Sequence, residues 1–311
     1  MTIGKPGSSA IVFPAMGPSR FADFGRFMVA NAAARRRFAV ADEVLGHSVF
    51  DALRESDDDY SEVAQVTSFV ASLALVEWGR DTGRQAPADY CAGVSFGKMA
   101  AAAHAGVLPF DEAVRLVAET ARCEAGYFAE HHSDIVTHSF VKIGPEKLDE
   151  LLAELAAADE WYEVSSHLDH DLYMVSLSER ALEGFKKRIG ACGGYSLYTM
   201  RPPAHASIFA PLRERVQQDV LARYRLRDPR VPIVSDQDGS LVESAEQAAQ
   251  WILGGFVRPM NWPGIVDTLV GRGVDRIAIV GRDRLLRRLR CTVDNFTTST
   301  LAPDSALKPV T

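Results

Sequence analysis

Apolar residues follow two spacings along this chain, and the spacings predict a mixture of buried strands and amphipathic helices. Short runs in which nearly every position is apolar or small predict strands with both faces buried. Runs in which apolar residues recur near every 3.6 positions predict helices with one buried face. The expected strands are 9–14, 88–94, 231–236 and 276–281, and the expected helices are 23–45, 63–78, 96–105, 108–128, 207–224, 245–257, 263–271 and 285–290. This alternation predicts an α/β fold.

A different order of elements interrupts this pattern in the middle of the chain. From about residue 134 to residue 200 the predicted order is β-α-β-β-α-β, which is that of a ferredoxin-like unit. We therefore expect a large α/β-hydrolase-like domain made of 1–130 and 201–311, with a small ferredoxin-like α+β subdomain over 131–200 inserted into it. The last stretch, 301–311, reads as a loose tail.

Composition narrows the class of protein. The chain has 311 residues, of which 47% are apolar, and a mean hydropathy of -0.05, so it can bury a sizeable core. No run of 18 apolar residues and no signal-peptide pattern occurs, and we expect a soluble, cytoplasmic protein without membrane contact. The four cysteines lie far apart with no C-x-x-C pair, which disfavours a zinc ribbon or a disulfide scaffold. We expect no metal.

Charge adds one feature. The formal net charge of -7 argues against a nucleic-acid partner, because phosphate binding needs a basic field. The bases are nevertheless uneven, since residues 271–290 hold seven Arg against two Asp. This Arg-rich stretch is either a solvated surface or a docking surface for an acidic partner.

One motif carries candidate chemistry. Residues 93–97, GVSFG, match G-x-S-x-G between a predicted strand and a predicted helix. Its glycines permit a sharp turn that lifts the Ser95 hydroxyl out of the sheet, and the following helix offers free N–H groups nearby. An ordinary glycine-rich turn gives the same letters. A serine nucleophile needs a base, and His205 lies in a rigid loop, RPPAHAS (201–207), where the large domain resumes.

The other histidines are weaker candidates. We expect His104 to be packed or exposed within its helix, and His131, His132 and His138 to face solvent. The HLDHD stretch (167–171) has the spacing of a metal site at His167 and His170, but a solvated hairpin turn explains it better.

Five motifs in this order resemble those of the malonyl-CoA:acyl-carrier-protein transacylases, and they extend across nearly the whole chain. They are FPAMGPS (13–19), AQ (64–65) before an apolar helix, GVSFG (93–97), PAHAS (203–207) and FVRPMNW (256–262). A ferredoxin-like insertion between elbow and histidine is also a feature of that family. The resemblance implies ping-pong acyl transfer, in which Ser95 attacks a thioester, His205 is the general base, and the acyl group passes to a second thiol.

The same resemblance implies the rest of the site. The backbone N–H groups of Met16 and Phe96 would form the oxyanion hole, and Gln65 would line the pocket. Asp236 would lie near the base, although a strand-end turn explains its segment equally well. No bound cofactor is implied, because the acyl group travels on the phosphopantetheine of a carrier protein or on coenzyme A.

Departures from the family pattern concern the acyl group. A gapless alignment places Thr120 where the family has the arginine that holds the malonyl carboxylate. Arg122, two positions on, is then turned by about 200° around the helix and points away from the pocket; a small shift in alignment would restore it. Without that arginine a malonyl carboxylate would be desolvated without a partner.

Apolar and small residues at the other pocket positions favour a larger, uncharged acyl group. These positions are Met16, Val94, Ala204 and Phe209. Similar departures occur in discrete acyltransferases of macrolactam polyketide pathways, and the chain resembles the vicenistatin-type dipeptidyl-carrier-protein transferases. This resemblance implies transfer of an aminoacyl or dipeptidyl starter between acidic donor and acceptor carrier proteins, by a monomer. The arginines expected to dock the carrier are Arg282, Arg284, Arg287 and Arg288.

Three alternatives stay open. The first is a malonyl-CoA:acyl-carrier-protein transacylase. The second is a thioester hydrolase with the same Ser95 and His205, in which water is the acceptor. The third is a non-catalytic module that binds carrier proteins.

Overall fold

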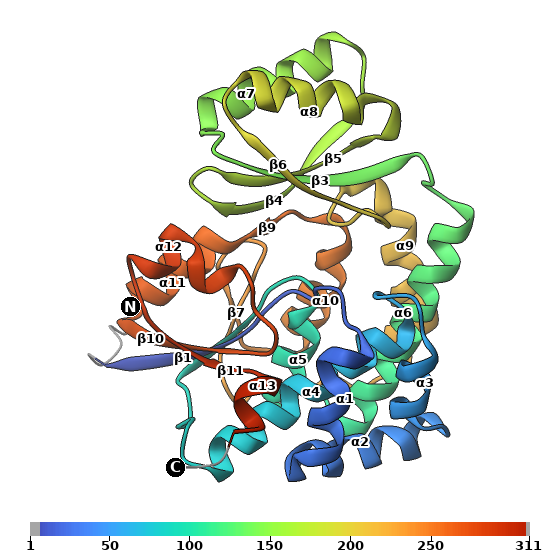
Figure 1. The fold of residues 1–311 in the computed structure, drawn as a ribbon, viewed down its shortest axis with the longest axis vertical. Helices are drawn as coiled ribbons and strands as arrows, with labels where there is room; N and C mark the ends of the chain where they lie inside the picture. Colours follow the sequence, from blue (N-terminus) through green and yellow to red (C-terminus); the bar gives the residue numbers. More distant parts are fainter. Residues whose placement is uncertain (1–6, 309–311) are drawn as a thin grey trace.

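The structure, a computed structural model, describes residues 7–308 and holds a large α/β part beside a smaller α+β part (Figure 1). The large sheet has six strands in the order β11-β10-β1-β2-β7-β8, and every neighbouring pair is parallel except β7 with β8. Its strands are β1 (Ser8–Phe13), β2 (Tyr90–Gly93), β7 (Ile233–Val234), β8 (Leu241–Val242), β10 (Val274–Val280) and β11 (Thr297–Leu301).

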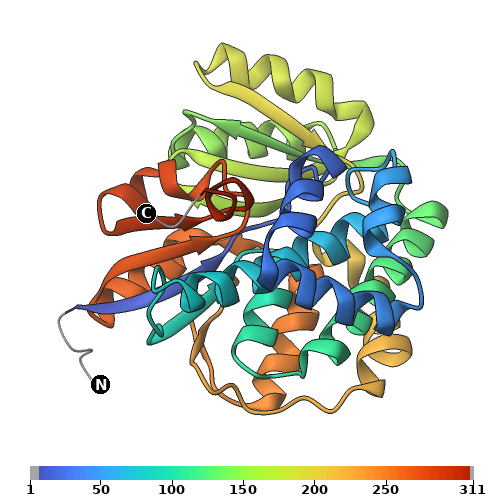
Figure 2. The ribbon, with the colours of Figure 1, turned by 60° about the horizontal axis from the view of Figure 1, so that its bottom comes forward.

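Helices cover both faces of this sheet, as a parallel sheet requires. Figures 1 and 2 show the N-terminal helices α1 to α4 grouped away from α11 and α12. The helices of the large part are α1 (Phe21–Ala30), α2 (Ala32–Leu45), α3 (Val49–Glu55), α4 (Glu62–Asp81), α5 (Gly97–His104), α6 (Phe110–Glu130), α9 (Ala210–Arg215), α10 (Ala245–Val257), α11 (Trp262–Gly271), α12 (Arg290–Val293) and α13 (Pro303–Ala306). Single turns complete it: η2 (Ser207–Phe209), the π-helical η3 (Val216–Val220), η4 (Leu221–Arg223) and η5 (Leu286–Arg288).

The central strand β1 shows how the sequence builds two cores from one strand. Successive side chains of a strand point to opposite faces. Ile11 and Phe13 pack into the cluster under α1 to α6 and α10, whereas Ala10 and Val12 pack into the cluster under α11 and the C-terminal segment. All four are at most 1% exposed, so the run of apolar residues in β1 reflects burial on both faces.

The small part is a ferredoxin-like unit with one strand added. Its sheet order is β6-β3-β5-β4-β9, and α7 and α8 lie along one face (Figure 1). Its elements are β3 (Ile135–Val141), α7 (Pro145–Ala157), β4 (Tyr162–Asp169), β5 (Leu172–Ser178), the turn η1 (Glu179–Ala181), α8 (Leu182–Ala191) and β6 (Tyr195–Met200). The fifth strand, β9 (Met260–Asn261), comes from the large part and pairs with β4 in parallel.

A buried carboxylate fastens the same junction. Asp169, at the end of β4, is 4% exposed and accepts hydrogen bonds from the backbone N–H groups of Arg290 (2.5 Å), Cys291 (3.3 Å) and His170 (2.9 Å). Desolvation acts to raise the pKa of Asp169, but these donors outweigh it and hold the pKa below its ordinary value. The small part is thus tied to α12 by a charge-assisted cap.

The predicted fold class is confirmed, while four elements differ from the pattern-based prediction. The helix expected over 285–290 is the turn η5 followed by α12, because Leu289 between them is extended. The helix expected over 23–45 is two helices, because Asn31 is extended and its side chain caps α2 by accepting from the N–H of Ala34. The helix expected over 207–224 is broken into α9 and the turns η2, η3 and η4. The tail expected to be loose contributes Leu301 to β11 and then forms α13, up to residue 308, and residues 309–311 of that prediction lie outside the described part.

We expect Asp169→Ala to lower the free energy of unfolding by about 1–3 kcal/mol at neutral pH, because buried N–H groups lose their acceptor. Since folding lowers the pKa of Asp169, its contribution is present above the unfolded value of about 3.9 and is lost as the pH falls through the folded value. Urea unfolding at several pH values measures both effects. Asp149→Ala, an exposed carboxylate on α7, is the matched control; equal losses in both variants would contradict the cap.

Candidate active site

Ser95 lies on a turn that only glycines permit. The turn joins β2 to α5, and Ser95 has a φ of +52°, in the left-handed region. A Cβ added to Gly93 would lie 2.5 Å from the carbonyl oxygen of Gly97, and one added to Gly97 would overlap the carbonyl oxygen of Phe13. The pattern G-x-S-x-G is therefore a packing requirement at both glycines, and it stores backbone strain at the serine.

His205 faces the serine across the junction of the two parts. Its Nε2 lies 2.9 Å from the Oγ of Ser95, and the ring is 7% exposed. His205 also adopts a positive φ, of +58°. The structure thus brings together the two residues that the sequence paired across 110 positions.

The small part holds the histidine loop in place. The N–H of Ala204 donates to the Oγ1 of Thr137 on β3 (3.1 Å), and the Oγ of Ser176 on β5 donates to the carbonyl of Ala204 (3.3 Å). On the other side of the histidine, the N–H of Ser207 donates to the carboxylate of Glu163 on β4 (2.7 Å). Three strands of the inserted unit therefore position the imidazole.

Burial keeps the His205 imidazole neutral. Desolvation, and then the charge of Lys98, lower the pKa of His205 to about 4, against the opposing effect of Asp236 and of the nearby backbone of Gly255 and Arg258. Its Nδ1 has no well-aligned hydrogen-bond partner among the described residues. A neutral ring at neutral pH accepts a proton from the hydroxyl in front of it.

Asp236 accepts a hydrogen bond from the backbone of Ser95, and it forms none with the His205 ring. Its Oδ2 accepts from the N–H of Ser95 (2.8 Å), and its Oδ1 accepts from the indole N–H of Trp251 (2.9 Å). The Lys98 ammonium lies 3.7 Å from Oδ2. Asp236 is 1% exposed, and so this carboxylate is a buried clamp on the elbow.

Lys98 is a site residue that the sequence analysis missed. It follows Gly97 in the first turn of α5, and its side chain is 8% exposed. A Cβ on Gly255 of α10 would overlap the ammonium group, so Gly255 leaves the room that Lys98 occupies. The available signal was a lysine directly after the elbow glycine, in an otherwise apolar helix.

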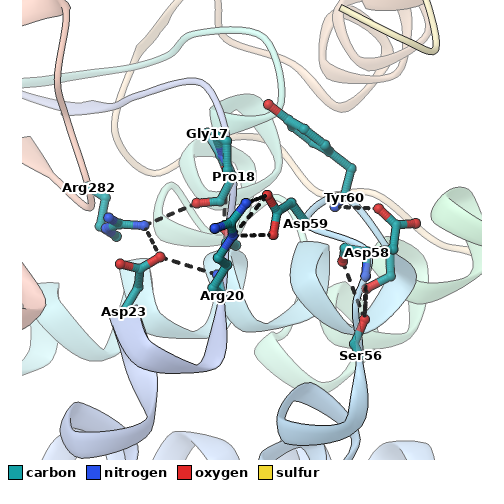
Figure 3. A network of polar contacts seen from close by, with 11 residues as sticks. Gly17, Pro18, Arg20, Asp23, Ser56, Asp58, Asp59, Tyr60 and Arg282 are labelled. Carbon is teal, nitrogen blue, oxygen red and sulfur yellow. Dashed lines mark hydrogen bonds and ion pairs between the residues drawn. The ribbon is translucent and has the colours of Figure 1, made fainter.

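The two expected oxyanion donors border the same space as Ser95. Met16 and Phe96 both line the cavity, and neither backbone N–H has a hydrogen-bond partner among residues 7–308. The Met16 loop is braced by a polar network (Figure 3). In it Arg282 pairs with Asp23 (2.5 Å) and donates to the carbonyl of Pro18 (3.0 Å).

Of the four arginines expected at a docking surface, Arg282 is the one with an ion pair. It pairs with Asp23 in the first turn of α1 and donates to the Pro18 carbonyl in the loop before that helix. Arg284, Arg287 and Arg288 are exposed, and none of them forms an ion pair with any described residue.

A cavity of about 730 Å³ opens in front of the serine and histidine. Of the residues expected at the pocket, those on its wall are Gln65, Thr120, Arg122, Ala204 and Phe209. Arg122 was expected to point away once Thr120 took its place, yet both line the cavity. The reason is length: the Arg122 side chain, 58% exposed, reaches the rim, where it lies 3.6 Å from Glu62.

Val94 does not line the cavity, and this corrects the sequence-based expectation. It is 1% exposed and packs with Ala92 into the core cluster on the opposite face of the sheet. The alternation of β2 continues through Val94 and turns its side chain away from the serine.

Glu124 is the second site residue that sequence reasoning missed. It lies on α6, one turn after Thr120, and borders the cavity. Desolvation raises the pKa of Glu124 to about 7, although an interaction with the Gln65 amide and the charge of Lys98 act to lower it. Glu124 is half-buried, and its signal was an acidic residue inside the apolar stripe of α6.

The other histidines take structural places. His138, expected in solvent, is 1% exposed, and its two ring nitrogens lie 2.9 Å from the hydroxyls of Thr199 and Ser196. His104 packs against Phe13 in the core, and His167 stacks on Tyr173. Within residues 7–308 no group of three or more His, Cys, Asp or Glu side chains is arranged to hold a metal ion. None of the described helices is long and apolar enough to cross a membrane.

We expect the His205 ring to titrate near pH 4 in an NMR titration, well below the ordinary 6.5, with His205→Ala identifying its signal. Lys98→Met should raise this midpoint, because the lysine charge disfavours the imidazolium, and its loss leaves only desolvation to oppose Asp236. A midpoint between 6 and 7 in the unmodified protein would contradict the buried, neutral ring.

Known proteins share this fold and, in part, this sequence. Residues 139–200 match a family model described as the VinK acyltransferase small domain. The malonyl CoA-acyl carrier protein transacylase of Escherichia coli K12 is 24% identical over 96% of this chain and 97% of its own length.

Two solved structures superimpose over nearly the whole chain. FabD from Acinetobacter baumannii gives a TM-score of 0.86 at 18% identity, with 97% of this chain and 96% of that chain covered. The malonyl-transacylase PlMCAT, solved in complex with the type II PKS acyl-carrier protein AntF, gives 0.85 at 21% identity, with 97% and 98% covered. The chain is therefore related in sequence and fold to the malonyl-CoA:acyl-carrier-protein transacylases, and its residues 139–200 match the model of the VinK acyltransferase small domain.

Proposed function

We propose that the chain transfers an aminoacyl or dipeptidyl starter between two acyl carrier proteins through an acyl-Ser95 intermediate. The observation that carries the transfer chemistry is the 2.9 Å contact between Ser95 Oγ and His205 Nε2, on a strained elbow that opens into the cavity. The relatives named above support an acyl carrier protein as the partner. The choice of acyl group rests on the charges of the cavity wall.

The proposed reaction has two symmetrical halves. Ser95 Oγ attacks the thioester carbonyl while His205 Nε2 takes the hydroxyl proton, and the N–H groups of Met16 and Phe96 stabilise the oxyanion. The C–S bond breaks, and the donor thiol leaves with the proton from His205. The acceptor thiol then gives its proton to His205 and attacks the ester carbonyl, which transfers the acyl group and restores the Ser95 hydroxyl.

Charge pairing in the cavity disfavours a malonyl group. Each Lys or Arg side chain on the described wall already has a carboxylate partner: Lys98 has Asp236, Arg122 has Glu62, and Arg201 has Glu179. A substrate carboxylate would have to displace one of them or stay unpaired, and an unpaired buried charge is costly.

Malonyl transfer is the second candidate function. The curated relatives are malonyl transacylases. Arg122 lines the cavity, and its ion pair with Glu62 is long, at 3.6 Å. If Glu62 released Arg122, its guanidinium would offer the bidentate partner that a carboxylate prefers.

Intact-mass analysis distinguishes the two. We expect incubation with a panel of carrier-bound thioesters to add an aminoacyl or dipeptidyl mass to the protein, with little addition from malonyl thioesters. Ser95→Ala should abolish every addition, and a second carrier thiol should remove the added mass faster than water does. Efficient loading of malonyl would favour the second candidate, and loss to water at the same rate would indicate a hydrolase.

We also propose that Arg284, Arg287 and Arg288 dock the carrier protein. Reversing all three to Glu should lower kcat/KM for a carrier-bound substrate by about tenfold or more, and rising salt should lower the unmodified enzyme's rate, because complementary charge steers encounter. Activity toward a small N-acetylcysteamine thioester should stay unchanged. Arg225→Glu, at another exposed arginine without an ion pair, is the control. If the triple variant lost equal activity toward the carrier-bound substrate and the small thioester, the docking role would be contradicted.

A further inference from the structure

Helix α6 presents one carboxylate to the cavity, in an otherwise apolar stripe. Apart from Arg122, whose side chain is mostly exposed, the α6 residues on the cavity wall recur at helical spacing: Val117, Thr120, Ala121, Glu124, Ala125 and Phe128. Thr120 and Glu124 are four positions apart and so lie one above the other on the same face. The face of α6 that borders the cavity of Ser95 and His205 therefore combines apolar contact with one hydroxyl and one acid.

Glu124 differs from the other acids of the cavity because it is neither paired with a cation nor exposed. Glu62 is paired with Arg122, and Asp58 is an exposed turn residue that accepts from the N–H of Tyr60 (2.8 Å). Among residues 7–308 no Lys, Arg or His nitrogen lies within ion-pair distance of the Glu124 carboxylate, and Lys98 is held 3.7 Å from Asp236.

A neutral amide already orients the carboxylate. The Gln65 side chain donates to the carbonyl of Tyr60 (3.2 Å), which fixes the amide, and the same amide interacts with Glu124. A fixed neutral donor places the carboxylate without neutralising it. The cavity thus keeps a positioned, uncompensated acid.

We propose that Glu124 is the specificity-determining residue of this site and binds the free ammonium group of an aminoacyl or dipeptidyl chain; this inference rests on the acyl transfer proposed above. An ammonium supplies the missing cation and up to three hydrogen-bond donors. A malonyl carboxylate would instead meet a like charge in a desolvated place.

The raised pKa agrees with this assignment. Desolvation brings the pKa of Glu124 to about 7 in the empty cavity, so the bare carboxylate is only partly ionised at neutral pH. A bound ammonium group stabilises the ionised form of Glu124 and offsets the cost of desolvating this carboxylate, whereas an uncharged acyl chain does not. Discrimination then comes from burial of the acid together with its lack of a partner.

The cavity's size fits the same class of acyl group. Its volume of about 730 Å³ falls in the range of ordinary ligand pockets, which is generous for a malonyl group and suits a longer chain. Ser95, His205 and Glu124 all border this one space, so the carbonyl and the amino end of one acyl chain would be held together.

The test compares an aminoacyl N-acetylcysteamine thioester with the same acyl chain lacking only its amino group, with acyl-Ser95 formation followed by intact mass. We expect the unmodified enzyme to load the amino substrate about 10–100-fold faster in kcat/KM, the range of a hydrogen bond to a charged group. Glu124→Gln should lose this preference while loading of the des-amino substrate stays the same or improves. Glu130→Gln, an exposed acid at the end of α6, should keep the preference.

Each outcome bears on a definite claim. Equal preference in the unmodified enzyme and in Glu124→Gln would overturn the role of Glu124 and leave acyl transfer standing. If neither thioester loads Ser95 while a fluorophosphonate still labels it, the proposed function fails together with the inference. The preference of the unmodified enzyme for the amino substrate is measured without any variant. The test therefore stays decisive even if Glu124→Gln folds poorly, because a preference below threefold in the unmodified enzyme overturns the proposal.

Discussion

The buried carboxylate of Asp236 is the constraint on which the site depends. A charge that is 1% exposed must be satisfied on every side, and here its partners are the N–H of Ser95, the indole of Trp251 and the ammonium of Lys98. These partners come from the elbow, α10 and α5. One acid at the end of β7 therefore fixes three separate elements around the serine, and it holds the strained backbone of the elbow at the position that faces the histidine.

The second half of the site depends on the inserted domain. Ser95 is carried by the large sheet, whereas the loop of His205 is fastened to β3, β4 and β5 of the small one. The distance between Ser95 and His205 is thus a property of the junction between two sheets. Two further contacts keep that junction rigid, namely the pairing of β9 with β4 and the cap that Asp169 places on α12. Domain placement and catalytic geometry are accordingly one problem for this fold.

The sequence pattern correctly predicted the features that depend on close packing within a short segment. The elbow at 93–97 was predictable because close packing at its glycines leaves no other residue possible, and His205 because a proline-rich loop and a family motif mark it. Val94 was misjudged because the side to which a strand residue points depends on the register of β2 in the sheet. The C-terminal segment was misjudged for a similar reason: β11 exists because β10 offers an edge, and its own sequence is mostly small and polar.

Charges were the least predictable part, because their role depends on partners distant in sequence. Arg282 looked like a surface cation until Asp23 proved to lie beside it. The sequence did not identify Lys98 or Glu124 as site residues, because the role of one charged residue on an apolar helix face depends on neighbours that are distant in sequence. In the fold those surroundings differ: the acid that faces Lys98 cancels its charge, while Glu124 faces a cavity. Within residues 7–308, every Lys and Arg on that cavity wall has a carboxylate partner, so the uncompensated charge that the wall offers is negative.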